Sequence, residues 1–114
     1  MRKGRVAPAV AARPYELKRL RDPRTAAAYL SIAAEDEDPA AFLQALRNVA
    51  EAMGGISRLA ALAGLNRQQL YRTLSSKGNP ELRSLTKILN ASGLRLQIVA
   101  READSRGSLS RLNA

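Results

Sequence analysis

Residues 67–76, RQQLYRTLSS, combine side chains that can hydrogen-bond to DNA bases with two leucines that can anchor a helix. At about 100° per residue, the polar side chains fall on the helix face opposite Leu70 and Leu74 or on its shoulder. Arginine can bond guanine O6 and N7, and an amide can bond adenine N7 and N6. Exposed helix faces are usually polar, but this one contains no acid. We therefore predict a base-reading face made of Gln68, Gln69, Arg72, Ser75 and Tyr71.

The residues before this stretch predict the first half of a helix-turn-helix. Gly64 permits a tight turn, Leu65 fills the junction and Asn66 is suited to cap the second helix. In such a motif the first helix braces while the second presents polar side chains to the major groove. The inward face of the first helix is expected to consist of Ile56, Leu59, Ala60 and Ala63.

Contacts to DNA phosphates are expected at both ends of this motif. Ser57 can cap its helix, whose N–H groups and positive dipole end attract an anion. Arg58, Arg83 and Lys87 can equally be solvated charges. The predicted phosphate-binding residues are Ser57, Asn66, Arg67, Ser76, Lys77 and Asn79.

The remaining elements follow from residues that begin and end helices. Asp22-Pro23, Asp38-Pro39 and Asn79-Pro80 each place a capping side chain before a proline, which suits the first position of a helix. Glycines at 54, 64, 78 and 93 predict helix ends. We therefore predict an all-α domain of five helices, at roughly 23–35, 39–53, 57–63, 66–76 and 80–92. Their apolar stripes are expected to form the core: Ala26, Tyr29, Leu30 and Ala33; Phe42, Leu43, Leu46, Val49, Ala50 and Met53; Leu82, Leu85, Ile88 and Leu89.

After Gly93 the apolar period changes to two, which predicts a short β-strand. A lone strand needs an edge to pair with, and no other strand is predicted. The simplest partner is the same strand of a second copy, paired antiparallel across a two-fold axis. We therefore predict a homodimer with Leu94, Leu96 and Ile98 at its interface, alternating with Arg95, Gln97 and Val99.

Charge is distributed unevenly along the 114 residues, which suffice for one small domain with tails. The net charge of +9 suits a polyanionic partner, although a merely basic protein is the alternative. Residues 1–24 carry eight basic and two acidic side chains, residues 25–51 one and five, and residues 52–99 seven and one. A single partner does not easily explain an acidic block between two basic ones.

Several classes of function are disfavoured by composition. Cysteine and histidine are absent, so thiolate chemistry, Cys-based zinc sites and the commonest general base are excluded. We predict no catalytic residues, no metal and no cofactor. No run of about 18 apolar residues could span a membrane. The run Val6–Ala12 is too weak for a signal peptide, so we predict a cytoplasmic protein.

Three regions are predicted along the chain. Residues 1–14 are expected to be a disordered basic arm, which could add phosphate contacts or be a solvated extension. Residues 15–100 are expected to be the DNA-binding domain. Residues 101–114 are expected to be a flexible tail.

The segments LAALAGLNRQQLYRTLS, KGNPELRSLTKIL and GLRLQIV resemble the Xre/HigA-like helix-turn-helix antitoxins of the addiction-module antidote family. The resemblance covers residues 15–99. It implies a lambda-repressor-like domain whose dimer binds operator DNA in its own promoter and represses the operon. It also implies that the protein binds and neutralises a RelE/HigB-like toxin encoded beside it.

The resemblance suggests a partner for the acidic block, because RelE-like toxins are generally basic. It makes four residues candidate toxin contacts: Glu35, Asp36, Glu37 and Asp38. The alternative is an acidic cap and solvated linker before Pro39. The segment Tyr15–Arg24 is another candidate.

Other functions remain open. A stand-alone regulator with the same fold but no toxin would have the same sequence pattern. A basic RNA-associated protein is disfavoured, because base-stacking platforms need more aromatic side chains than the 4% present. An enzyme is the least favoured, because four consecutive acids cannot all converge on a substrate.

Overall fold

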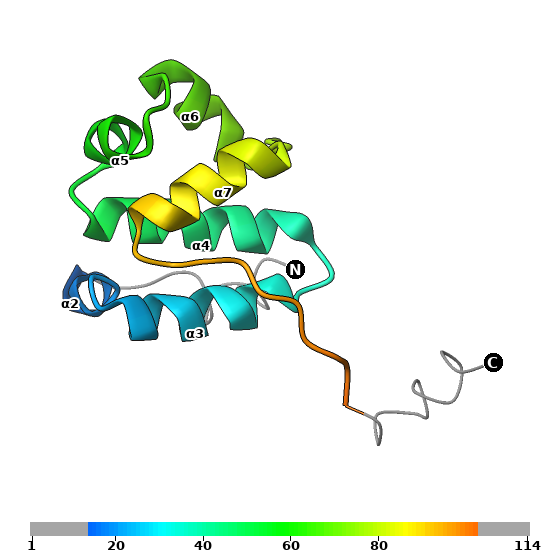
Figure 1. Cartoon of the computed structure of the whole chain (residues 1–114). Helices are drawn as coiled ribbons and strands as arrows, with labels where there is room; N and C mark the ends of the chain where they lie inside the picture. Colours follow the sequence, from blue (N-terminus) through cyan, green and yellow to red (C-terminus); the bar gives the residue numbers. More distant parts are fainter. Residues whose placement is uncertain (1–13, 103–114) are drawn as a thin grey trace.

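The computed structural model describes residues 14–102, with side chains from Leu17 onward. In this part of the chain the fold is all-α, as predicted (Figure 1). Of the predicted arm and tail, only Pro14, Arg101 and Glu102 lie within the described residues. The helices are α2 (Pro14–Arg19), α3 (Pro23–Ala34), α4 (Pro39–Ala52), α5 (Ile56–Ala63), α6 (Arg67–Thr73) and α7 (Leu82–Ala91).

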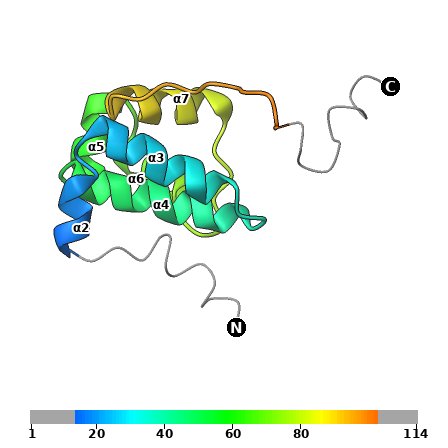
Figure 2. The same ribbon diagram turned by 90° about the horizontal axis from the view of Figure 1, so that it is seen from below.

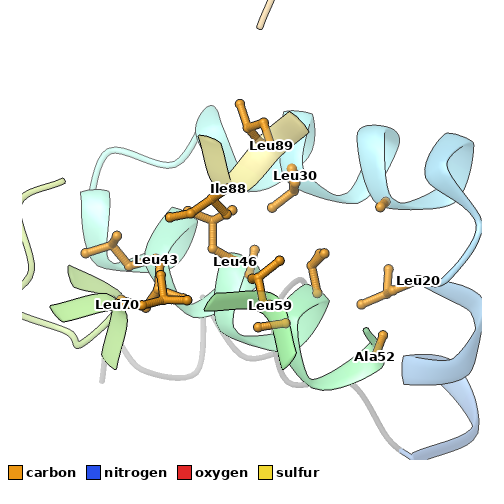
Figure 3. Close-up of a cluster of buried hydrophobic side chains, with 14 of the residues drawn as sticks. Leu20, Leu30, Leu43, Leu46, Ala52, Leu59, Leu70, Ile88 and Leu89 are labelled. Atoms are coloured by element: carbon orange, nitrogen blue, oxygen red, sulfur yellow. The ribbon is translucent and has the colours of Figure 1, made fainter. Parts of the chain in front are cut away.

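Helix α4 is the centre of the packing. It contributes more buried side chains than any other described helix and contacts α2, α3 and α5. Helix α5 in turn packs against α6 and α7. Helices α5 and α6 lie across α4 from α3 (Figure 1), whereas α7 also borders α3, with Leu89 next to Leu30 (Figures 2 and 3). Leucines from the separate elements meet around Leu46, which is 1% exposed (Figure 3). Each such leucine contributes roughly 1.5–3 kcal/mol by leaving water.

Three predicted helix caps are confirmed. The Asp22 carboxylate accepts the backbone N–H of Arg24 at 3.0 Å, and Asp38 accepts that of Ala40 at 3.0 Å. Each acid is followed by the proline that begins its helix. The Asn66 side chain accepts the N–H of Gln69 at 3.0 Å at the start of α6. The local sequence therefore fixes where α3, α4 and α6 begin.

The predicted number of helices and two of the predicted starts were wrong. The described residues contain six helices, because α2 precedes the first predicted helix. Helix α7 begins two residues after Asn79-Pro80, with Glu81 as a cap residue that makes no side-chain bond. Asn79 and Pro80 instead belong to the connection from α6. Ser57 does not cap α5, because this helix begins at Ile56 after Gly55, whose φ of 103° suits only glycine.

Helix α6 ends earlier than predicted. Its last residue is Thr73, so Ser75 and Ser76 lie beyond the helix. The Ser75 hydroxyl donates to the Arg72 carbonyl at 2.8 Å, and the Ser75 N–H bonds the same carbonyl at 3.1 Å. These bonds satisfy an acceptor at the helix end and close the last turn. The predicted positions of Ser75 and Ser76 on the helix face were therefore wrong, because the rotation of about 100° per residue does not continue beyond Thr73.

Most predicted core residues are buried or packed against the core, with one clear exception. Leu82 is 66% exposed because it is the first residue of α7, beyond the edge of the core. Tyr29 and Phe42 are half-buried and pack against the core.

The predicted strand is not formed within the described chain. Residues 94–102 run as an extended stretch that begins beside α3 and α7 and then leads away from the helices (Figures 1 and 2). A strand requires a neighbouring strand, and a single copy supplies none within residues 14–102. Leu94 is held by its N–H bond to the Leu89 carbonyl at 2.8 Å and packs on the core. A groove of about 640 Å³ separates the stretch from α3.

Candidate nucleic-acid interface

Helices α5 and α6 form the predicted helix-turn-helix arrangement. Leu59 and Ala60 are buried and fix the inner face of α5, while Ile56 and Ala63 are half-buried. Gly64 ends α5 in the left-handed conformation, with φ 70° and ψ 35°. The N–H of the next residue, Leu65, returns to the Ala60 carbonyl at 2.9 Å. This bond satisfies an acceptor at the helix end and turns the chain sharply into α6.

The predicted inward direction of α6 is confirmed. Leu70 is 1% exposed and Leu74 is 0% exposed. The predicted base-reading residues of the helix itself all lie outside the core. Gln68, Gln69 and Arg72 are exposed, and Tyr71 is 68% exposed. Ser75 is half-buried and uses its hydroxyl hydrogen on the Arg72 carbonyl.

Two predicted phosphate-binding residues are brought together across the motif. Arg67, the first residue of α6, donates its Nε–H to the Ser57 hydroxyl at 2.6 Å. Both side chains are exposed, so this contact joins the N-terminal ends of α5 and α6 at the surface. The remaining candidates are also exposed: Asn66 at the cap of α6, and Ser76, Lys77 and Asn79 in the connection to α7.

The connection after α6 lies tightly against the helix end at Gly78. A Cβ added at this position would collide with the Thr73 carbonyl oxygen and crowd its carbonyl carbon. The Gly78 N–H also bonds the Ser75 carbonyl at 2.8 Å. Glycine is therefore required here for the close backbone approach that keeps Lys77 beside α6.

The helices of the motif, the connection after α6 and the next helix, α7, carry exposed positive charge. Six basic side chains of residues 56–87 are exposed, and Glu81 is the one acid in this range. Like charges repel one another in water, so an array of this kind is suited to a polyanion. The six are Arg58, Arg67, Arg72, Lys77, Arg83 and Lys87.

Arg47 is a residue of this site that the sequence reasoning missed. It projects from α4, and its guanidinium donates to the carbonyl of Leu74, the C-cap residue of α6, and to the Gln44 side chain. Burial lowers the pKa of the Arg47 guanidinium, and the nearby Tyr71 hydroxyl opposes this shift. The only sequence signal was that Arg47 is the one basic residue in the acidic block 25–51.

The acidic block adopts the cap-and-linker arrangement. Asp38 caps α4, and the Asp36 carboxylate accepts the Asp38 N–H at 2.8 Å. Glu35 is the C-cap residue of α3, and Glu37 is exposed in the linker. Within residues 14–102, no group of three acidic side chains could hold a metal ion. None of the helices described there is long and apolar enough to cross a membrane.

A family described as "Probable addiction module antidote protein" matches residues 14–100, most of the chain. The chain belongs to this antidote family. An uncharacterised protein of Haemophilus influenzae (strain Rd) is 33% identical to this chain over 70 residues. The alignment covers 61% of this chain and 71% of that relative. No solved structure matches this chain significantly.

Proposed function

We propose that this antidote is a dimeric, cytoplasmic, Xre/HigA-like antitoxin that binds operator DNA through α6. It also binds and neutralises a RelE/HigB-like toxin encoded beside it, and it represses the operon of the pair. The observation that carries the DNA-binding part is the acid-free polar face of α6. Leu70 and Leu74 anchor this helix behind the Gly64 turn, and its other side is exposed. Family membership supports the toxin-binding part.

In this proposal α6 enters the major groove and reads base edges. Arg72 bonds a guanine, while Gln68 and Gln69 bond adenines. Tyr71 contributes its ring and hydroxyl at the edge of the contact, and Ser75 offers a hydroxyl oxygen as an acceptor. The four helix side chains are exposed and Ser75 is half-buried at the helix end, so all five come from one anchored helix or its end and can contact neighbouring base pairs together.

The phosphate backbone is contacted on both sides of α6. Arg67, held by Ser57 at 2.6 Å, is directed along the surface between the two N-terminal helix ends. Asn66 lies at the same end of the motif, and Lys77, Ser76 and Asn79 lie at the other. Such contacts set the position of the protein on DNA without reading sequence.

Two copies pair through their C-terminal segments. Leu96, Ile98 and Val99 are exposed at 53%, 85% and 72%, respectively, in an extended stretch. Antiparallel pairing with a second copy would satisfy backbone groups and bring the Leu96 and Ile98 side chains of the two copies together, with Leu94 at the inner end. A symmetric dimer also matches the two half-sites of an operator.

Charge supports a basic toxin as the partner of the acidic block. Glu35 and Glu37 are exposed beside Asp36 and Asp38, at the junction of α3 and α4. Capping by Asp38 does not prevent this role, because a carboxylate has several acceptor sites. The segment 15–24, which includes most of α2, remains a second candidate surface.

Substitution of Arg72 tests the DNA-reading proposal. Arg72→Ala should weaken binding to the duplex directly upstream of the gene by about 1–3 kcal/mol, the value of one bidentate base contact. Arg83→Ala removes the same charge from an exposed position on α7 and should have a much smaller effect. Fluorescence anisotropy measures both. Equal binding by Arg72→Ala and the wild type would refute the proposed reading face.

Two alternative functions are separated by simple experiments. A stand-alone regulator would bind DNA but would not co-purify with the product of the adjacent gene. An RNA-associated protein would bind single-stranded RNA and duplex DNA with comparable affinity. For the antitoxin, DNA affinity should fall by ~10³ or more between 50 and 200 mM salt if six or more phosphates are contacted.

A further inference from the structure

Arg47 bonds the end of α6 without belonging to the helix-turn-helix. It lies 27 positions before Leu74 in sequence, and its guanidinium donates to the Leu74 carbonyl. A second guanidinium nitrogen donates to the Gln44 side chain, one turn earlier on α4. The planar guanidinium thus holds two acceptors in a fixed geometry. This contact connects the central helix of the core directly to the C-terminal end of α6.

Helix α6 needs such support because it is short. It spans seven residues, and isolated helices shorter than about 12 residues are marginal in water. Its N-terminal end is held by Asn66, and its inner side is held by Leu70 and Leu74. Arg47 places a positive charge at the C-terminal end, where the helix dipole and the last carbonyls are negative.

The position of Arg47 is itself fixed by side chains that lead to α3. Gln44, which accepts from Arg47, donates to the Asn48 side chain at 3.2 Å. The Asn48 amide then donates to the Tyr29 hydroxyl at 2.6 Å. Arg47 is half-buried among these groups, so its guanidinium is confined rather than mobile in solvent.

The contacts of Arg47 support the C-terminal end of α6, where part of the base-reading face lies. Tyr71 and Arg72 lie in the last turn of α6, two or three residues before the carbonyl that Arg47 holds. Gln68 lies in the first turn, next to the Asn66 cap. A loss of the Arg47 bond would therefore displace Arg72 more than Gln68.

We infer that Arg47 is a positioning residue that fixes the C-terminal turn of α6 and so determines base discrimination by Arg72 without touching DNA. This inference rests on the proposed function. It predicts that removing Arg47 lowers specificity more than it lowers non-specific affinity, because the phosphate-binding residues Ser57, Asn66 and Arg67 lie at the opposite end of α6 from the turn that Arg47 holds.

The probe is a duplex that the full-length wild type selects from a randomised 20-base-pair library, compared with a scrambled duplex. Arg47→Met should lower the ratio of selected to scrambled affinity on the order of tenfold, the discrimination of one bidentate contact. Repeating the selection with Arg47→Met should give no base preference at the base pair that Arg72 contacts. The base preference should be retained at the base pair that Gln68 contacts.

Arg21→Met is the matched control. Arg21 donates its Nε–H to the Ala52 carbonyl at 3.1 Å, so it makes the same kind of bond at the end of α4. This control removes the same charge and a comparable helix-end bond, but it should leave the affinity ratio unchanged. A ratio that is unchanged in Arg47→Met, or lowered equally in Arg21→Met, overturns the inference.

A second variant is used if Arg47→Met does not fold, as judged by circular dichroism. Arg47→Lys retains the charge, but its point-like ammonium group cannot reproduce the planar fork. In this variant the ratio of selected to scrambled affinity should fall roughly two- to tenfold, which corresponds to the net free energy of one hydrogen bond. An unchanged ratio in folded Arg47→Lys overturns the inference. If the wild type selects no duplex, the proposed function itself fails; if it selects one, only the role of Arg47 is at stake.

Discussion

The helix-turn-helix side and the side formed by α3 with residues 94–102 differ in the side chains they expose. On the first side, the leucines of α6 are buried and its amides and arginine are exposed, while α5, α6 and α7 each expose one large apolar side chain. On the second side, three of the four residues 96–99 are exposed and apolar, and Ile32 of α3 is also exposed. A polar, basic surface suits DNA, whereas an extended apolar segment suits another polypeptide. The comparison supports two separate binding surfaces.

The largest expected effect comes from making the apolar segment acidic. A Leu96→Asp/Ile98→Asp double variant would place carboxylates on both copies of the paired segments, where like charges repel. Analytical ultracentrifugation should then give the 12.3 kDa mass of one chain instead of about twice that mass. Thermal stability of the helices should change little, because both side chains are exposed in the single copy.

The matched control for this experiment is Leu62→Asp. Leu62 is an exposed leucine on α5, so its substitution makes the same chemical change on the other side of the molecule. This variant should remain dimeric. A double variant that also remains dimeric would move the subunit interface away from residues 94–98.

A smaller effect is expected from Gly78→Ala, which disturbs the connection after α6 on the helix-turn-helix side. The added Cβ meets the Thr73 backbone, so α6 and its connection must move apart, at a cost of about 1–3 kcal/mol. Urea denaturation measures this loss of unfolding free energy. Gly64→Ala serves as a contrast, because a Cβ there meets open space and only the left-handed backbone is strained. A Gly78→Ala variant with the unfolding free energy of the wild type would contradict the close approach of Gly78 to the Thr73 backbone.

The smallest effects separate the two roles proposed for the acidic block. Asp38→Ala should lower the unfolding free energy by about 0.5–2 kcal/mol through loss of the α4 cap. Asp38→Asn retains a capping oxygen and should be nearly neutral. If the block binds a basic toxin, Asp38→Asn and Glu37→Gln should both weaken toxin binding in calorimetry without loss of stability. Unchanged toxin affinity in both would leave only the capping role.

How well each feature could be predicted depends on whether its cause is local. Asp22, Asp38 and Asn66 cap helices through residues two or three positions away, so their roles could be inferred from sequence. Asn79-Pro80 has the same local pattern but lies in a connection whose path depends on the approach of Gly78 to Thr73. The order of residue types along the chain does not reveal this approach, because the contact exists only in the folded protein.

In the candidate site, too, the feature with a local cause could be predicted from sequence and the feature with a long-range cause could not. The inward direction of α6 followed from the spacing of Leu70 and Leu74, because helical geometry alone determines it. The role of Arg47 depends on the crossing of α4 and α6, which joins residues 27 positions apart. The partner that we propose for residues 94–99 is a second copy, which neither the sequence nor one folded chain supplies.

The most direct test of two separate surfaces is a nuclear magnetic resonance titration of the ¹⁵N-labelled protein with the selected duplex. The largest amide shift changes are expected in residues 64–77, around Gln68 and Arg72. Residues 94–100 should show little change, because they are engaged with the second copy. Largest changes in residues 94–100 or in α3, with α6 unaffected, would contradict the assignment of α6 as the DNA-reading helix.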